Sequence, residues 1–190
     1  MKKKTFMILS LCLAAAVIVG GVFFFYYDGL SSAAGNTDNT LAAVKNNITR
    51  RAQLTEKLAD FAKAHGEVEK QTLDAATDAC GAAKSAKAVS ELEAAESALG
   101  KAESALKLAL RASAPGLVNT DTAYAALTED IYEAKKATGT LRKNHNAAVR
   151  AYNEKISSFP WSFFSRLYGF GEKSCFAAEE DTLETPAVDF

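Results

Sequence analysis

The sequence predicts an all-α protein in which an N-terminal transmembrane helix precedes a long antiparallel up-down-up bundle of three helices and an aromatic C-terminal segment. A charge-free run near the N-terminus predicts the first helix, and apolar residues spaced three and four apart predict the others. Alanine is abundant, whereas the 190 residues include only 3 prolines and 11 glycines, the residues that helix interiors tolerate least. The predicted units are an anchor (residues 1–28), a polar linker (29–40), a helical bundle (41–178) and an acidic tail (179–190).

The first unit has the pattern of a membrane anchor. Residues 2–4 are lysines, and Phe6 to Tyr27 then runs for 22 positions without a charge. A helix of that length spans about 33 Å, close to the hydrocarbon thickness of a bilayer. The aromatic residues 23–27 suit the membrane interface at its end. The alternatives are a cleaved signal peptide, whose apolar region would be roughly 7–15 residues long, and a lipid-modified Cys12.

The charges beside this span predict its orientation. Three lysines and the amino terminus precede it, and Lys45 is the first basic residue after it. The positive-inside rule then places the N-terminus in the cytoplasm and the bundle on the extracytoplasmic side of the inner membrane, with a single pass. Ala16 and Gly20 have the small-xxx-small spacing that favours self-association of transmembrane helices.

Three amphipathic segments follow the polar residues 31–40. Helices are expected over about 41–82, 88–112 and 120–158, and the second has the near-heptad spacing of a coiled coil. Gly81, the Ser-Ala-Pro-Gly sequence at 113–116 and Pro160 mark their ends. Because short connections place successive helices antiparallel, residue 159 is expected to emerge at the end of the bundle far from the membrane.

Composition excludes several classes of function. A net charge of −1 without a basic stripe argues against nucleic-acid binding. His65 and His145 lie on apolar stripes and are interpreted as core residues, because two imidazoles alone do not make a zinc site. The sequence shows no nucleophile elbow and no glycine-rich phosphate loop, so no enzyme activity, metal or cofactor is expected.

Two of the three cysteines are expected at the same end of the bundle. Cys80 falls near the end of the first predicted bundle helix, and Cys175 follows the third, so both are expected at the far end of the bundle. In an extracytoplasmic compartment they are a candidate disulfide pair that would pin the C-terminal segment, although two unrelated thiols are the favoured interpretation. Spacing in sequence does not establish the required Cα separation of about 4.4–6.8 Å.

An aromatic segment follows the third predicted helix, over residues 159–176. Its large rings are Phe159, Trp161, Phe163, Phe164, Tyr168 and Phe170. Such a cluster suits a cap over the open end of the bundle, a docking site for a partner, or a membrane interface. The cap is favoured, and the membrane interface least, because the segment is expected far from the anchor. The acidic residues 179–190 are predicted to be disordered.

Several stretches, taken in order, resemble the LemA family of bacterial membrane-anchored helical proteins. They are Arg-Arg-Ala-Gln-Leu at 50–54, Lys-Gln-Thr-Leu-Asp-Ala-Ala-Thr-Asp-Ala at 70–79, Asn-Ala-Ala-Val-Arg-Ala-Tyr-Asn-Glu-Lys-Ile at 146–156, Phe159-Pro160, Gly169-Phe170, Phe176 and the final Val-Asp-Phe. The chain departs from the family where a Leu-Ile-Pro-Asn-Leu sequence usually follows the arginine pair, and Cys80 stands where relatives tend to have arginine. The resemblance implies an anchored long-helix bundle and supplies no catalytic residues.

These observations favour an interaction or scaffold protein of the bacterial cell envelope, with a protein partner there and the membrane as its anchor. A sensory or small-ligand-binding bundle is the alternative. Its polar candidates inside the bundle are Thr72, Thr138 and the two histidines. An enzyme is the remote third hypothesis.

Overall fold

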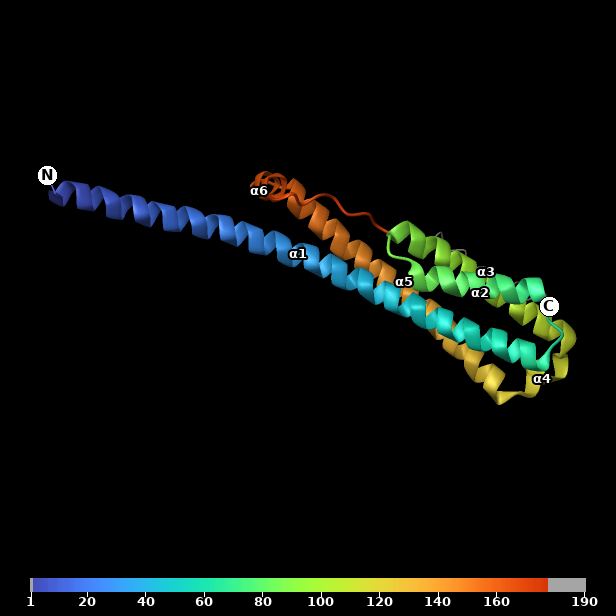
Figure 1. The fold of residues 1–190 in the computed structure, drawn as a ribbon. Helices are drawn as coiled ribbons and strands as arrows, with labels where there is room; N and C mark the ends of the chain where they lie inside the picture. The colour runs from blue at the N-terminus through green and yellow to red at the C-terminus, as the bar shows by residue number, and fades with distance from the viewer. Residues whose placement is uncertain (1, 178–190) are drawn as a thin grey trace, which may run out of the picture.

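The computed structural model describes residues 2–177, with side chains from residue 6 onward except residue 8. The described chain is all α-helix apart from its connections and its C-terminal segment, so the predicted all-α class is confirmed. The helices are α1 (Lys2–His65), α2 (Lys70–Ser85), α3 (Val89–Ser113), α4 (Pro115–Thr120), α5 (Thr122–Ser157) and α6 (Trp161–Tyr168). Figure 1 shows α1 projecting far beyond the other helices at its N-terminal end.

The longest element, α1, joins three units that the sequence analysis separates. Its 64 residues cover the predicted anchor, the predicted linker and the first half of the first bundle helix, a length of about 96 Å. The linker predicted over residues 29–40 is therefore helical. Leu30 and Thr37 in this stretch are fully buried against C-terminal parts of the chain, and such tertiary contacts override weak helix propensity.

The helix predicted over 41–82 is two antiparallel helices, because the chain turns back between His65 and Lys70. Gly66 lies at this turn, where an added Cβ would come within 2.8 Å of the Ser113 hydroxyl and 3.1 Å of a Leu110 methyl. Glycine therefore allows the end of α1 to approach the end of α3 closely. The apolar spacing continues through the turn, so periodicity alone did not reveal it.

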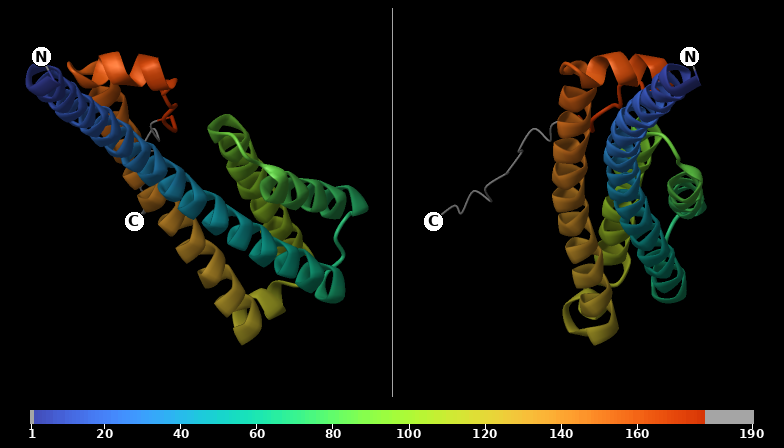
Figure 2. Two further views of the ribbon diagram at one scale, coloured as in Figure 1. Left: turned by 60° about the vertical axis from the view of Figure 1, so that its left-hand side comes forward. Right: turned by 90° about the vertical axis from the view of Figure 1, so that its left-hand side faces the viewer.

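This extra turn changes the direction of everything that follows. We call the end from which the apolar part of α1 projects the anchor end, and the opposite end the far end. The helices α1 and α3 run toward the far end, whereas α2 and α5 run back (Figures 1 and 2). The course is up-down-up-down, and α5 ends beside α1 at the anchor end.

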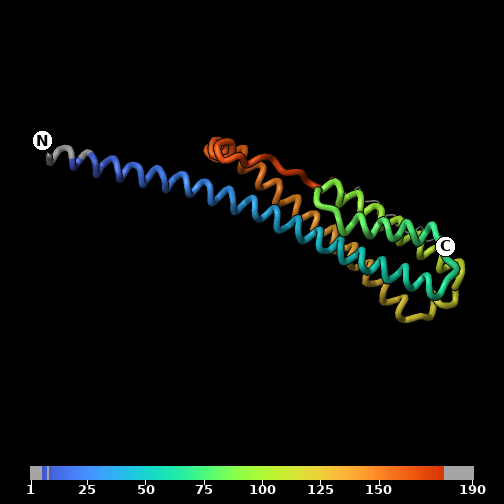
Figure 3. Tube along the Cα trace, viewed as in Figure 1, coloured from blue at the N-terminus to red at the C-terminus, as the bar shows by residue number. Residues whose placement is uncertain are grey.

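The bundle has two parts with different cross-sections. In the far half, α1, α2, α3 and α5 surround one core built mostly from leucine and alanine. Because α2 has only 16 residues, it returns about 24 Å and leaves the anchor half to α1 and α5. There a second apolar cluster forms around Leu30, Tyr152, Ile156 and Phe164, and the segment after α6 runs along it toward the near ends of α2 and α3 (Figure 3).

Candidate functional site

The short helix α6 lies across the end of α5, transverse to α1, as Figures 1 and 2 show. Its inner side packs aromatic rings on the last part of the charge-free run of α1. Phe164 stacks on Tyr26 with ring centroids 4.0 Å apart, and it meets Phe23 edge-on at 5.3 Å. The Tyr168 hydroxyl donates a hydrogen bond to the carbonyl of Phe23 at 2.9 Å. Helix α6 is thus fixed to α1 at a defined level.

A glycine and a lysine fix the other side of this contact. Gly29 faces Trp161 so closely that an added Cβ would lie 2.6 Å from the indole ring. The Lys155 ammonium donates to the carbonyl of Gly29 at 2.8 Å and lies 4.2 Å from the centroid of the Trp161 ring. This cation–π contact and hydrogen bond join the end of α5 to both α1 and α6.

The six rings predicted as a cap or docking segment therefore divide into two groups. Phe164 is buried, and Trp161, Tyr168 and Phe170 are half-buried. Phe159 and Phe163 are 88% and 60% exposed. The prediction that all six rings lie at the far end is wrong. The additional reversal between α1 and α2 brings α5 and α6 back to the anchor end.

After α6, residues 169–177 form an extended strap. Gly169 ends the helix in the left-handed conformation, with φ of 78°, which glycine adopts without strain. Two asparagines of α5 then bind the strap backbone, each through both the nitrogen and the oxygen of its side-chain amide. Asn153 bonds with the N–H and carbonyl of Lys173, and Asn146 with the N–H and carbonyl of Phe176. These paired bonds satisfy backbone groups that have no helix or sheet partners.

The strap also connects α5 to α1. The Lys173 ammonium donates to the hydroxyl of Thr37, to the carboxylate of Asp38 and to the carbonyl of Ala34. It lies 5.4 Å from the centroid of the Tyr152 ring, whose hydroxyl donates to the carbonyl of Gly171. In the anchor half, where α2 and α3 are absent, the strap thus adds polar contacts to the apolar packing of α1 on α5.

A recess of about 370 Å³ opens where the strap meets the start of α3, and His145 lies in its lining. The Thr40 hydroxyl forms hydrogen bonds with the carbonyl of Thr37 at 2.8 Å and with Nδ1 of His145 at 3.0 Å. Nε2 of His145 is buried without a hydrogen-bond partner among the described residues. Burial lowers the pKa of His145 below its ordinary value, although nearby carbonyls of Ser174 and Thr37 act in the opposite direction.

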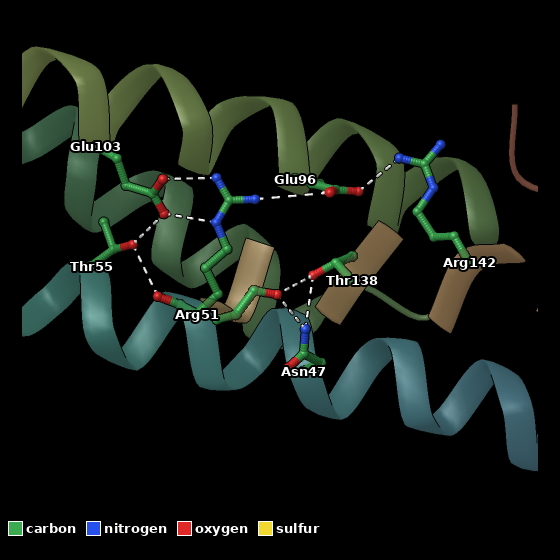
Figure 4. A network of polar contacts seen from close by, with 8 residues as sticks. Asn47, Arg51, Thr55, Glu96, Glu103, Thr138 and Arg142 are labelled. Atoms are coloured by element: carbon green, nitrogen blue, oxygen red, sulfur yellow. Dashed lines mark hydrogen bonds and ion pairs between the residues drawn. The ribbon is translucent and has the colours of Figure 1, made fainter. Parts of the chain in front are cut away.

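A buried ionic network crosses the far half of the bundle (Figure 4). Arg51 of α1 donates Nε and Nη2 to the two carboxylate oxygens of Glu103 on α3, at 2.8 and 2.7 Å. The Thr55 hydroxyl donates to the same carboxylate at 3.0 Å. The Arg51 side chain is only 1% exposed, so this bidentate pair is screened little by solvent.

The network continues to α5 and to the strap. Glu96 lies 3.8 Å from Arg51 and accepts a hydrogen bond from Arg142 at 3.0 Å. Arg142 also donates to the carbonyl of Ala177 and lies over the ring of Phe176 at 5.3 Å. Charged side chains thus connect α1, α3, α5 and the end of the strap.

This network is not identified by the sequence analysis. A signal was present. Arg51 follows Ile48 by three positions and precedes Thr55 by four, which places it on the buried stripe of α1. Glu103 follows the buried Leu99 by four positions on α3 in the same way.

The proposed disulfide partners are separate free thiols. Cys80 lies on α2 and donates to the carbonyl of Ala52, whereas Cys175 lies on the strap beside Asn146 and shares the recess with Asp38. The levels of Ala52 and Asp38 differ by about 21 Å along α1, well beyond disulfide reach. Burial raises the pKa of the Cys80 thiol to about 11.

The other polar candidates do not converge. His65 is exposed at the far end of α1, where it bonds the carbonyl of Phe61, so the two histidines are distant. Thr138 is buried and accepts from Asn47, and Thr72 lines an alanine-rich groove of about 650 Å³ between α2 and α3. Among the described residues, no three histidine, cysteine or acidic side chains are grouped to hold a metal.

The model of the LemA family matches residues 40–190 of this chain. The chain belongs to the LemA family. No curated protein matches it. The stretches that carry the resemblance coincide with the contacts described above, since Arg51 pairs with Glu103, and Asn146, Tyr152 and Asn153 hold the strap. The acidic tail predicted over 179–190, including its final Val-Asp-Phe, lies outside the described residues.

Proposed function

We propose that this LemA-family protein is a single-pass membrane protein that acts as a non-catalytic interaction or scaffold protein of the bacterial cell envelope. The observation that carries the proposal is the continuity of α1. One helix supplies both an exposed apolar stretch and the central helix of the bundle. A partner bound to the bundle would therefore be held at a fixed distance from the bilayer.

The support for the anchor is its length and exposure. Among the described residues, α1 is the one helix long and apolar enough to cross a membrane, and none of the residues in its most apolar stretch is buried in the bundle. Phe6, Leu11 and Val17 are each more than two-thirds exposed, which in water would leave a large apolar surface uncovered.

The proposal places the anchor in the inner membrane, with the bundle on the extracytoplasmic side, because the lysines at residues 2–4 precede the span. The test is protease accessibility of a C-terminal tag in intact spheroplasts, with lysed spheroplasts as the control. Digestion without lysis supports the orientation. Protection until lysis would place the bundle in the cytoplasm.

The scaffold role requires a partner protein in the envelope or a second copy of the chain. A photo-crosslinking residue at Ala75 or Ala105, which line the groove between α2 and α3, tests for one in intact cells. The matched control is the exposed Ala151 on α5. A discrete crosslinked species from the groove, absent from the control, supports the role. The same species from every position, or none from any, argues against it.

A small-ligand-binding bundle is the second candidate, and the recess beside His145 favours it. The buried Nε2 there, which lacks a partner among the described residues, would suit a ligand with a polar group that completes its hydrogen bonding. The test is a thermal-shift screen in which a stabilising compound is re-examined on His145→Phe. Loss of the shift with the fold retained supports the site, whereas an unchanged shift removes this recess as the binding site.

A further inference from the structure

The outer side of α6 carries an apolar stripe that nothing in the described chain covers. Phe159, Phe163 and Leu167 are spaced four apart and are 88%, 60% and 54% exposed. Phe163 and Leu167 lie four positions apart on α6 and form one row along it, and Phe159 lies in the turn that precedes the helix. Arg166, which is also exposed, lies beside this row. Helix α6 is therefore apolar on its inner side, where it packs on α1, and again along this outer row.

The direction of the row follows from the hydrogen bonds of Ser165. Its hydroxyl donates to the carbonyl of Ile156 near the end of α5, so this side of α6 faces the bundle. Phe163 and Leu167 each lie two positions from Ser165, and two positions turn an α-helix by about 200°. Both therefore project away from α5, on the side toward which α1 continues into its apolar stretch.

The level of α6 along α1 matches the edge of a bilayer. The ring and hydrogen-bond contacts with α6 and its preceding turn fall on Phe23, Tyr26, Tyr27 and Gly29 of α1. A hydrocarbon core of about 30 Å takes roughly 20 helical residues, so a span that begins at Phe6 ends near Phe25. Because α6 is transverse to α1 (Figure 2), a bilayer crossed by α1 would have α6 lying parallel to its surface, at the headgroup boundary.

We propose that α6 is an interfacial helix that lies on the same bilayer that α1 crosses, with Phe163 and Leu167 inserted at the boundary of the acyl chains. This inference rests on the membrane anchor proposed above. Arg166 is placed to reach lipid phosphates beside the inserted row. An isolated helix of eight residues would bind a bilayer weakly, but α1 already holds α6 at the surface, so its insertion is an intramolecular step.

This second contact would have a mechanical consequence. A single spanning helix leaves a bundle free to tilt and rotate on the membrane. With α6 also inserted, the bilayer is contacted by α1, which crosses it, and by α6, which lies along its surface. The strap joins the rest of the anchor half to these two helices. The bundle is then presented upright, with α2 and α3 farthest from the bilayer.

The chain's only tryptophan is Trp161, so tryptophan fluorescence can report on single positions. We would place Phe163→Trp in a Trp161→Phe background and reconstitute the full chain in vesicles of phosphatidylcholine and phosphatidylglycerol. Part of the lipid would carry bromine near the headgroup end of its acyl chains. Leu108→Trp in the same background is the matched control, because Leu108 is 69% exposed on α3, in the far half. Circular dichroism would verify that each variant is folded, and flotation in a density gradient would verify that it is bound to vesicles.

Insertion places the row about 5–10 Å into the boundary, so brominated lipid should remove at least about half of the emission from Phe163→Trp and almost none from Leu108→Trp. Flotation without quenching at either position would overturn the inference, leave the anchor intact and leave this face for a protein partner. Equal quenching at both would also overturn it, because the bundle would then lie flat. Failure to float would refute the proposed anchor instead. If Trp161→Phe unfolds the chain, the same two substitutions are measured with Trp161 present, as differences from the parent.

Discussion

Arg51→Met should destabilise this protein far more than the loss of a helix-surface charge. The substitution leaves Glu103 inside the bundle with the Thr55 hydroxyl as its remaining hydrogen-bond donor, because both Arg51 bonds, at 2.8 and 2.7 Å, are lost. The side chains of Arg51 and Glu103 are 1% and 7% exposed. Removing one partner of such a buried pair costs about 3–5 kcal/mol of unfolding free energy, because the buried carboxylate of Glu103 loses its bidentate ion pair.

A double variant and a surface control distinguish an unpaired buried charge from the simple loss of a contact. In the double variant Arg51→Met with Glu103→Met, neither charge remains, and most of the lost stability should return. Glu96 keeps its bond to Arg142 at 3.0 Å and should not be stranded by the change. Lys84→Met is the control. Lys84 and Glu56 form a 2.6 Å pair with both side chains 42% exposed, and its loss should cost less than about 1 kcal/mol.

The assay is thermal unfolding of the full chain in detergent micelles, followed by circular dichroism at the helix band. For a domain of this size each kcal/mol shifts Tm by about 2–4 °C, so Arg51→Met should lower Tm by roughly 6–20 °C. A loss no larger than that of Lys84→Met would refute the reasoning. So would a double variant that is no more stable than the single one.

Three further predictions concern other parts of the molecule. Gly29→Ala should displace α6 and red-shift the emission of the chain's only tryptophan, because the new Cβ would lie 2.6 Å from the ring of Trp161. Gly35→Ala is the control, and it should leave the emission unchanged because the space around Gly35 is open. Burial lowers the pKa of His145 from its ordinary 6.5. Between that value and the lowered pKa, the unfolded chain binds a proton at this histidine that the folded chain does not. The free energy of unfolding should therefore be highest above about pH 6.5 and should decline as the pH falls toward the lowered pKa. Urea unfolding at several pH values should show this decline, and His145→Gln should flatten it; an unchanged slope would contradict the assignment. In the native chain a maleimide should modify Cys175 much faster than Cys80, whose thiol is buried with a pKa of about 11, and equal rates by mass spectrometry would contradict this.

The sequence by itself determined the helical class, the apolar N-terminal stretch and the family. Charge-free length and three-four spacing are local properties of the chain, and they survive any arrangement of the helices. The limits of α3 and α5 also followed from local signals. Glu91 accepts bonds from the N–H groups of Lys87 and Ala88 at the start of α3, and Asp121 accepts from Tyr124 at the start of α5.

The tertiary structure decided which end of the bundle each segment occupies. Gly66 permits a reversal because the end of α3 lies against it, and the helical spacing on both sides concealed that turn. One unrecognised reversal inverts the direction of every later helix, which moved the aromatic segment from the far end to the anchor end and separated Cys80 from Cys175. Residues 29–40 likewise lie within α1, where contacts with α5, α6 and the strap bury Leu30 and Thr37. These outcomes depend on contacts between segments distant in the sequence, such as Gly66 with Ser113 and Thr37 with Lys173, and such contacts leave no periodic signal in the sequence.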